Sequence, residues 1–252
     1  MYHCFIDSPA RREDYLEAND GNALFGLKFC ATRWLEDVPV AKRAIQIWPC
    51  IQKYVVATQK LSKSKRPTCQ SYVNLQEYVH DPLMPAKLNF FVSIANVLVP
   101  FLELFQTDRP MMPFISSELQ EMLNNLLGRF IKKSVLDSAG NVGKVDVRNK
   151  ENIVPPEKVD IGFAAKQAVD EVVKDRKASQ LQVFEFYQGC IAFLQNMTEK
   201  LLERCPLKYG IVRAMNALDP RYITSNPGKS SEKMEIILKK AAECKVDEFS
   251  LM

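Results

Sequence analysis

A run of cations is the feature of this sequence with the clearest potential for chemistry. Between Val38 and Gln76 the chain has no aspartate or glutamate. The same stretch carries these basic side chains: Lys42, Arg43, Lys53, Lys60, Lys63, Lys65 and Arg66. Cations without neighbouring carboxylates attract phosphate groups, which supply much of the affinity of proteins for nucleic acids. The sequence therefore predicts a nucleic-acid-binding segment, and the alternative is a solvated helix face followed by a basic loop.

A second candidate contact precedes this segment, at the pair Arg33 and Trp34. An indole ring can stack on a nucleic-acid base, while the neighbouring guanidinium binds the adjacent phosphate. The alternative for Trp34 is a packing residue at the start of a helix. The other tryptophan, Trp48, falls among apolar residues and is predicted to lie in the core.

Residues for catalysis are scarce in this sequence. It has no glycine-rich phosphate-binding motif, no serine-hydrolase motif and no zinc-protease motif. The two histidines, His3 and His80, have no cysteine at zinc-ligand spacing. Paired carboxylates such as Asp170 and Glu171 are typical of solvated helix surfaces. We therefore expect no catalytic residue, metal site, cofactor or small-molecule substrate.

Two features of the sequence bear on the cellular location of the protein: its cysteines and its most apolar stretch. Seven cysteines are widely spaced without a CxxC motif, which predicts reduced thiols in a nuclear or cytoplasmic protein. The first fifteen residues are too charged for a secretory signal. Residues 88–105 are predicted to form an amphipathic helix rather than a membrane span. Its expected apolar face is Leu88, Phe91, Val92, Ala95, Val99, Leu102 and Phe105.

A long helix is predicted to position the cations, from Asp37 to about Ser62, with a bend at Pro49. Successive residues of a helix are 100° apart, which places Lys42, Lys53 and Lys60 within roughly 20° of one another. The opposite face is apolar and consists of Val40, Ala44, Ile47, Trp48, Ile51, Tyr54 and Val55. Residues 62–69 follow as a polar, basic loop.

The rest of the chain is predicted to be helical as well. Glycine is scarce, with 9 in 252 residues, and the periodicities favour a mainly α-helical bundle with at most one or two short strands. The strand candidates are residues 23–29 and a strand or hairpin at 142–147. Further helices are expected near 68–79, 84–106, 114–133, 163–175, 179–204 and 231–244. Ser8 and Pro9 are typical of the N-cap and first turn of a short helix. Within 114–133, Ser116 or Ser117 gives a capping-box-like start, and the expected apolar stripe is Leu119, Met122, Leu123, Leu126, Leu127 and Phe130.

The helix expected at 179–204 carries an apolar stripe with a three-then-four spacing. The stripe consists of Phe184, Tyr187, Ile191, Leu194 and Leu201, and Thr198 interrupts it. This spacing indicates packing within a helical bundle, and a dimer seam is the alternative.

Several stretches resemble vertebrate proteins derived from hAT-family transposases. These stretches are residues 7–18, 27–49, 81–91, 105–115 and 216–221, and the most specific motifs lie at 32–34, 106–114 and 218–221. The resemblance implies an RNase H-like core whose catalytic acids are separated by a large helical insertion domain. It also implies an Arg-Trp pair at the entrance to that insertion, whose Trp handles a flipped base at the transposon end. Arg33 and Trp34 match that pair.

The resemblance also implies a domain organisation. We expect a remnant of the core edge at 1–33, a first helical half of the insertion at 34–137, a linker loop at 138–160 and a second helical half at 161–252. The family's first two catalytic aspartates lie upstream of the part that matches residues 1–20, and its third acid has no match before Met252. Because three acids must hold the metal ions for strand transfer, no transposase activity is expected.

The expected function is therefore a non-catalytic helical domain that contacts nucleic acid through the basic helix and Arg33 with Trp34. The alternative is a helical module that associates with itself or with another protein. A third interpretation, a transposon relic without a selected function, predicts an exposed apolar face and aggregation.

Overall fold

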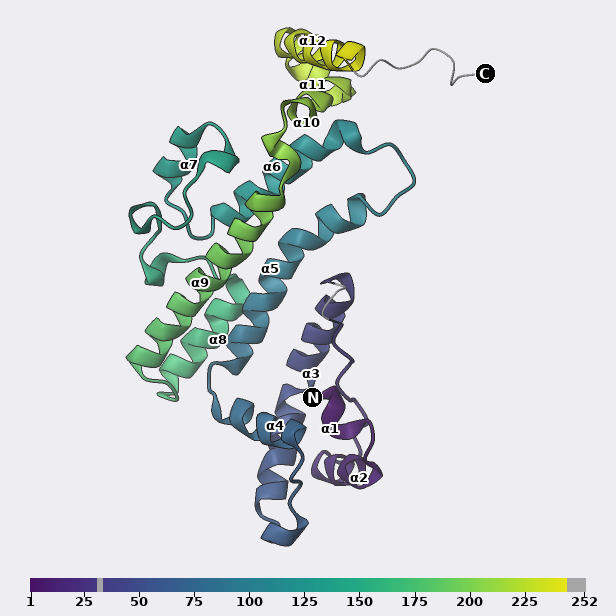
Figure 1. The fold of residues 1–252 in the computed structure, drawn as a ribbon. Helices are drawn as coiled ribbons and strands as arrows, with labels where there is room; N and C mark the ends of the chain where they lie inside the picture. The colour runs from purple at the N-terminus through teal and green to yellow at the C-terminus, as the bar shows by residue number, and fades with distance from the viewer. Residues whose placement is uncertain (31–33, 244–252) are drawn as a thin grey trace. The chain divides into compact units, whose positions relative to one another are not determined.

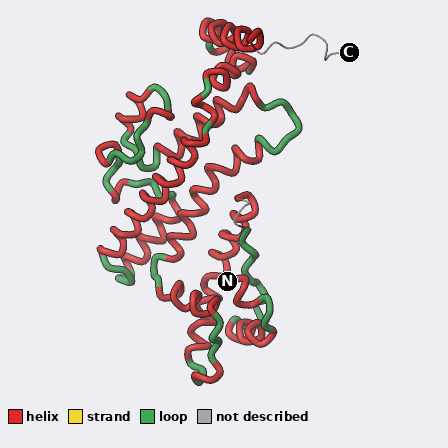
Figure 2. The backbone as a smooth tube through the Cα atoms, in the orientation of Figure 1, coloured by secondary structure: helices red, strands yellow, loops and turns green. Residues whose placement is uncertain are grey.

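The structure is a computed structural model that describes residues 1–30 and 34–243, apart from the side chains of Trp34 and Leu35. The described residues form helices and loops without a strand (Figure 2). The prediction of a mainly α-helical protein is confirmed. The α-helices are α1 (Tyr2–Phe5), α2 (Pro9–Ala18), α3 (Trp34–Gln59), α4 (Gln70–His80), α5 (Met84–Leu104), α6 (Met112–Leu127), α7 (Lys133–Ala139), α8 (Phe163–Lys174), α9 (Gln180–Arg204), α10 (Gly210–Ala214), α11 (Pro220–Ser225) and α12 (Pro227–Glu243) (Figure 1).

The chain divides into two compact units, and each unit combines two stretches of sequence. Unit 1 consists of Met1–Val99 and Asp160–Cys190, and unit 2 consists of Pro100–Val159 and the chain from Ile191 onward. Two of the divisions fall inside α5 and α9, where the sequence gives no sign of a boundary. The domains predicted from the family resemblance have the bounds 1–33, 34–137, 138–160 and 161–252. They describe the architecture of a family, which these compact units do not test, and they stay a prediction.

The core of unit 1 forms where α1 to α4 meet. Its buried members are Cys4, Phe5, Tyr15, Ile47, Ile51, Tyr54, Val55, Tyr72 and Leu75. Aromatic rings fill much of it: the ring of Phe5 lies 5.0 Å from that of Tyr15 and 5.2 Å from that of Tyr54. The helix α2 begins as expected, with Pro9 in its first turn and the Ser8 side chain accepting a hydrogen bond from the Arg11 backbone N–H.

Residues 23–29 do not form the predicted strand. Leu24 and Phe25 pack against the core of unit 1, which explains the apolar character of the segment. Side chains bind its carbonyl groups: the Tyr15 hydroxyl donates to Leu24 O at 2.9 Å, and Arg43 Nη1 donates to Phe25 O at 3.3 Å. A strand needs a neighbouring backbone as its partner, and here side chains take that place.

The long helix α3 passes through both Pro39 and Pro49 without ending at either. It ends at Gln59, three residues before the predicted end at Ser62. The apolar face that the sequence predicts is buried at Ile47, Trp48, Ile51, Tyr54 and Val55. Each proline lacks a backbone N–H donor and therefore weakens the helix. The burial of the apolar face stabilises α3 despite the two prolines.

The remaining part of unit 1 contains α8 and the adjoining parts of α5 and α9, which run side by side (Figure 1). The buried residues of α5 are Ala86, Phe90, Ile94, Ala95 and Leu98. Of the apolar face predicted for this helix, Ala95 is fully buried and the other members are half-buried, whereas Phe90, Ile94 and Leu98, outside that face, are buried. The helix is apolar around most of its circumference, and the spacing therefore could not identify its buried side.

By length and composition, α5 is also the one helix among the described residues that could cross a membrane. The same character occurs in core helices of soluble proteins, so a single such helix is weak evidence for a membrane span.

Unit 2 packs α6 against α10 and the 3-10 helix η6 (Met215–Leu218). The buried apolar residues predicted for this region are all buried: Leu119, Met122, Leu123, Leu126, Leu127 and Phe130. The helix begins at Met112 rather than near Ser116, because Pro113 occupies its first turn and Ser116 is buried inside the helix.

The glycine- and valine-containing stretch before α8 has no hairpin at 142–147. It contains α7 and the 3-10 helices η2 (Val142–Lys144), η3 (Lys150–Asn152) and η4 (Pro156–Lys158). An isolated antiparallel bridge joins Ile131 to Ile153. The valines that suggested a strand are instead buried without a strand partner: Val142, Val145 and Val147. Gln195 of α9 fixes the segment by donating to Val147 O at 2.8 Å.

Candidate nucleic-acid interface

The exposed side of α3 carries three of the predicted lysines. Lys42, Lys53 and Lys60 are exposed, with Gln46, Pro49 and Val56 between them on the same side. With a rise of 1.5 Å per residue, Lys42 and Lys53 are about 16 Å apart along the axis, and Lys53 and Lys60 about 10 Å. The cations thus follow a line along the helix, opposite to the face that packs into the core of unit 1.

The loop after α3 adds further exposed cations. Lys63 and Lys65 lie in the 3-10 helix η1 (Lys63–Lys65), and both side chains are exposed. Together with Lys60 they gather beyond the C-terminus of α3. Cations are favoured at this end of a helix, because its unpaired carbonyl groups carry partial negative charge. This effect is the structural alternative to a binding role.

Arg66 has a defined structural task in the same loop. Its Nε donates to Leu61 O at 2.9 Å, and its Nη2 donates to Gln59 O. Both carbonyl groups lie at the end of α3, where no further turn of helix can satisfy them. Arg66 therefore caps α3 and holds the loop against the helix end.

Arg43 likewise lies apart from the line of lysines. It is half-buried, and its Nη1 binds Phe25 O, so it anchors the segment at 23–29. The exposed set that remains from the predicted site is Lys42, Lys53, Lys60, Lys63 and Lys65. The sequence alone could not distinguish these exposed lysines from the two arginines with structural roles. The carbonyl groups that bind the arginines come near them only when the chain is folded.

The predicted stacking pair lies outside what the structure describes. Arg33 is outside the described residues, and Trp34 is described only as the first residue of α3. The structure therefore does not test the prediction for these two residues. The other tryptophan, Trp48, is buried as predicted, and its Nε1 has no hydrogen-bond partner.

Unit 2 contains a hollow that brings together two distant motifs. Residues from 103–118 line a hollow of about 660 Å³ with Arg221. The Arg221 guanidinium lies 5.2 Å from the centre of the Phe114 ring, and it also binds the Asp219 carboxylate. Glu103 and Glu118 line the same hollow, so its charge is mixed. The motifs at 106–114 and 218–221, which carry the family resemblance, thus meet here, a juxtaposition that sequence reasoning missed.

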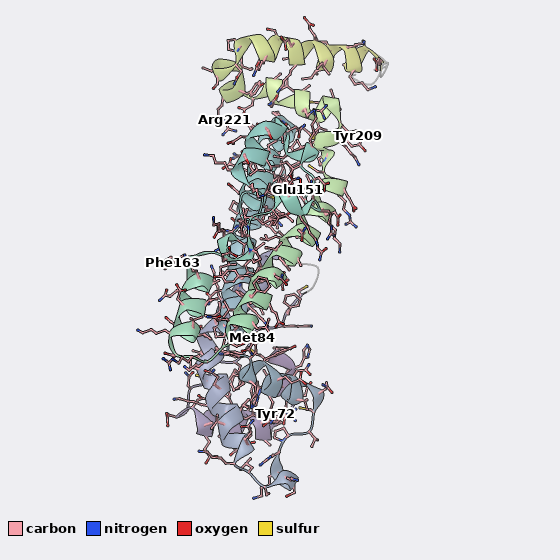
Figure 3. All side chains as sticks on the ribbon, turned by 90° about the vertical axis from the view of Figure 1, so that its left-hand side faces the viewer. Tyr72, Met84, Glu151, Phe163, Tyr209 and Arg221 are labelled. Atoms are coloured by element: carbon pink, nitrogen blue, oxygen red, sulfur yellow. The ribbon has the colours of Figure 1, made fainter. Side chains whose placement is uncertain are left out.

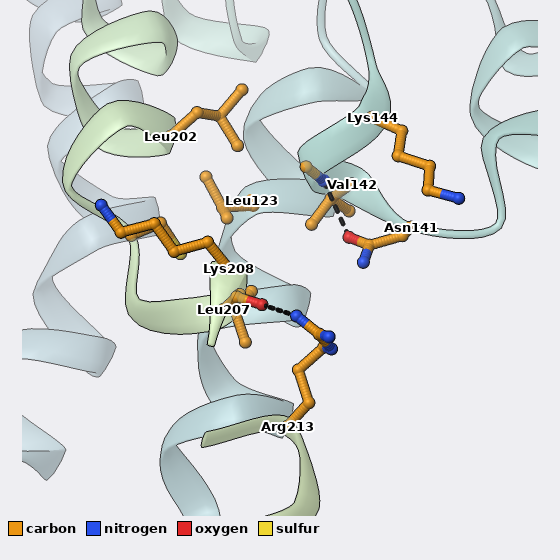
Figure 4. Close-up of a pocket in the computed structure, with 10 residues that line it drawn as sticks. Leu123, Asn141, Val142, Lys144, Leu202, Leu207, Lys208 and Arg213 are labelled. Atoms are coloured by element: carbon orange, nitrogen blue, oxygen red, sulfur yellow. Dashed lines mark hydrogen bonds between the residues drawn. The ribbon is translucent and has the colours of Figure 1, made fainter. Parts of the chain in front are cut away.

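A smaller hollow of about 150 Å³ lies in unit 2 next to η2 (Figure 4). Its cations are Lys144, Lys208 and Arg213, around an apolar floor. Arg213 donates to Leu207 O, and Lys208 Nζ lies 3.4 Å from Glu203 O and 5.3 Å from the centre of the Tyr209 ring. Because these two cations are engaged with the chain itself, the hollow has no convergent anion site.

Metal-binding clusters are not found in the part of the chain that the structure describes. No group of three or more His, Cys, Asp or Glu side chains there could hold a metal ion. No family model, curated protein or solved structure matches this chain. The likeness to hAT-family proteins therefore rests on the sequence motifs alone.

Proposed function

We propose that this chain is a non-catalytic, nucleic-acid-binding helical domain that contacts phosphates through the exposed lysines of α3 and the following loop. The observation that carries the proposal is the exposure of Lys42, Lys53, Lys60, Lys63 and Lys65. None of them forms an ion pair with a carboxylate among the described residues. Unpaired lysines can exchange their counterions for phosphates without breaking an internal contact.

The chemistry of these side chains defines the expected type of binding. Lysine carries a point charge on a flexible chain, and it does not impose the planar, bidentate geometry with which arginine reads guanine. Contacts to phosphates position a protein on nucleic acid but carry no sequence information. We therefore propose binding that depends strongly on salt and weakly on sequence.

The resemblance to hAT-family proteins supports a second, separable part of the proposal. In this part, Trp34 stacks on an unpaired base at the N-terminal end of α3, and Arg33 binds the adjacent phosphate. The variant Trp48→Phe leaves Trp34 as the sole tryptophan. It is expected to fold because Trp48 Nε1 has no partner to lose. Stacking predicts that a single-stranded oligonucleotide quenches the remaining fluorescence, and an unchanged emission at saturation would contradict it.

The main test is a titration of a labelled duplex at several salt concentrations, followed by fluorescence anisotropy. Each phosphate contact contributes a slope of about −0.9 to the dependence of log K on log salt. Five lysine contacts predict a slope of about −4 to −5 for binding to a duplex. The absence of salt-sensitive binding at low ionic strength would overturn the nucleic-acid function.

A second candidate function, association with a helical protein, is favoured by apolar side chains near the α8–α9 turn. Val173 is 50% exposed, Leu181 64% and Phe184 46%. Phe163, at the start of α8, is also exposed (Figure 3). The later members of the stripe on α9, Ile191 and Leu194, are buried within the chain. Any partner would therefore contact the first turns of α9 rather than the whole stripe.

Light scattering at two protein concentrations tests this second function for self-association. Association through this surface predicts that the measured mass of the wild-type protein rises to that of a dimer at the higher concentration. The double variant Leu181→Ser with Phe184→Ser should have the mass of the monomer at both concentrations. A strict monomer that binds DNA would exclude the self-association form of this function.

A further inference from the structure

Two thiols that are distant in the sequence meet in unit 1. Cys4 lies in α1 and is fully buried, and Cys69 immediately precedes α4 and packs against the same core cluster. Cys69 is near enough to the Cys4 thiol to raise the pKa of that thiol. The neighbouring residues also bring α1 and α4 together, because Ser71 Oγ lies 3.5 Å from His3 O. The fold thus places the two thiols as neighbours at the same core cluster.

The surroundings of Cys69 favour its thiolate form. Its Sγ lies 3.4 Å from the Ser71 hydroxyl. Arg11 is fixed nearby, since its Nε donates to Cys4 O at 2.6 Å. Partial burial acts to raise the pKa of Cys69, but the Ser71 hydroxyl, the Tyr72 backbone N–H and the Arg11 charge together lower it below its ordinary value. Because the thiolate is the nucleophilic form of cysteine, Cys69 is the reactive member of the pair.

Cys4 has the opposite character. Burial raises the pKa of its thiol to about 11, and the nearby Cys69 adds to the effect. Cys4 therefore stays protonated at neutral pH. A low-pKa thiol that neighbours a protonated one is the combination expected of an attacking and a resolving cysteine.

We propose that Cys4 and Cys69 are a dithiol oxidation site, which a peroxide converts into a disulfide between α1 and the start of α4. First, the Cys69 sulfur attacks the peroxide: an S–O bond forms, the O–O bond breaks, and the departing oxygen takes up a proton as water or an alcohol. Then the Cys4 sulfur attacks the Cys69 sulfur. The S–S bond forms, the S–O bond breaks, and the Cys4 proton leaves with the hydroxyl group as water. The two thiols lose two electrons, which reduce the peroxide.

The other cysteines provide internal controls. Cys50 borders the same core cluster and is similarly half-buried, but its Sγ lies 3.7 Å from Asn22 Nδ2. Cys50 therefore matches Cys69 in exposure without having the arrangement of an attacking thiol. Trypsin cleaves after lysine and arginine except before proline, and so places Cys4, Cys30, Cys50 and Cys69 in separate peptides: 1–11, 29–33, 44–53 and 66–87.

The test exposes the reduced, full-length chain to limiting hydrogen peroxide, blocks free thiols with N-ethylmaleimide in denaturant, and analyses tryptic peptides by mass spectrometry. We expect peptides 1–11 and 66–87 to be joined with the loss of two hydrogens, while peptide 44–53 carries the maleimide. The preference for a disulfide between Cys4 and Cys69 should disappear when the chain is oxidised in denaturant, because the fold no longer brings these two thiols together. Oxidation of Cys50 before this pair, or a disulfide from Cys69 to any other cysteine, would overturn the proposal.

Variants separate the two roles. In Cys4→Ala the crosslink should be lost and Cys69 should accumulate as a sulfenic acid, which dimedone labels. In Cys69→Ser, Cys4 should stay reduced, and Cys50→Ser should retain the crosslink. If Cys4 rather than Cys69 carries the dimedone label when its partner is replaced, the assigned roles are wrong. Since Cys4 is fully buried, the wild-type measurement decides the proposal even where Cys4→Ala does not fold.

Discussion

The hydroxyl oxygens of Thr58 and Tyr72 lie 2.6 Å apart in the buried core between α3 and α4. The Thr58 hydroxyl donates to a backbone carbonyl of α3, with Tyr54 O and Val55 O both at 3.0 Å. Thr58 has a single hydroxyl proton, so the proton between the two side chains belongs to Tyr72. Gln76 Nε2 in turn donates to the Tyr72 oxygen at 3.2 Å. A directed chain of hydrogen bonds thus joins α4 to α3.

This chain predicts coupled losses of stability. Tyr72→Phe should lower the free energy of unfolding by about 1 kcal/mol. Thr58→Val should lower it by about 1–3 kcal/mol, because the buried Tyr72 hydroxyl then has no acceptor for its proton. The double variant should cost at least about 0.5 kcal/mol less than the sum of the single variants, since both partners are then removed. Urea denaturation of the four proteins measures the coupling. Strict additivity would contradict the directed chain.

Tyr54, whose ring lies at 87° to that of Tyr72, should behave in the opposite way. Its side chain is fully buried, and its hydroxyl has no hydrogen-bond partner. Because a buried hydroxyl without a partner costs about 1–3 kcal/mol, Tyr54→Phe should leave the stability unchanged or increase it by about 1 kcal/mol. Tyr72→Phe is the matched control in the same denaturation experiment. A loss for Tyr54→Phe as large as that for Tyr72→Phe would reveal a partner for the Tyr54 hydroxyl.

The fold was largely predictable because its helices carry their own local signals. The six buried positions predicted from Leu119 to Phe130 follow directly from helical spacing. The two strand predictions failed for one physical reason. Phe25 packs against the helical core of unit 1 and Val145 is buried, both without a strand partner. A local pattern cannot reveal whether a neighbouring strand exists. The most buried face of α5 could not be identified from the sequence, because this helix is apolar around most of its circumference.

The candidate site was predictable only in part. Helical geometry alone places Lys42, Lys53 and Lys60 on one side of α3. The partners of Arg43 and Arg66 depend on how the chain returns to α3, as in the contact of Arg43 with Phe25 O. The proximity of Cys4 to Cys69 depends on the packing of α1 on α4, and the spacing of cysteines gives no indication of it.

The polar interruption in the stripe of α9 predicts a gain from a hydrophobic substitution. Thr198 is fully buried, and its Oγ1 has no hydrogen-bond partner. Thr198→Val should therefore raise the free energy of unfolding by about 1 kcal/mol. Leu194→Ala, at a fully buried position of the same stripe, should lower it by about 2–5 kcal/mol. Thermal and urea unfolding measure both, and a destabilised Thr198→Val would contradict the absence of a partner.

The N-terminus of α11 predicts a pH dependence of stability. Burial acts to raise the pKa of the Asp219 carboxyl, but hydrogen bonds from the Arg221 guanidinium and backbone N–H lower it below its ordinary value. A lowered pKa in the folded state stabilises the fold above the ordinary pKa, and this stabilisation is lost as pH falls through the folded value. Asp219→Ala should cost about 1 kcal/mol at pH 7, as for other helix caps. The difference from wild type should shrink below about pH 4, and a pH-independent difference would contradict the charge effect.

Reversal of two lysine charges on α3 tests the proposed interface most directly. Lys53→Glu with Lys60→Glu removes two phosphate contacts, so the salt slope of duplex binding should become shallower by about 2, and affinity at low salt should fall by about tenfold or more. The control is Lys166→Glu with Lys174→Glu, which makes the same change in net charge at two exposed positions of α8. The control should keep the wild-type slope, because only the local cations contact phosphates. If both double variants weaken binding equally, the net charge of the chain, and not the line of lysines on α3, attracts the nucleic acid.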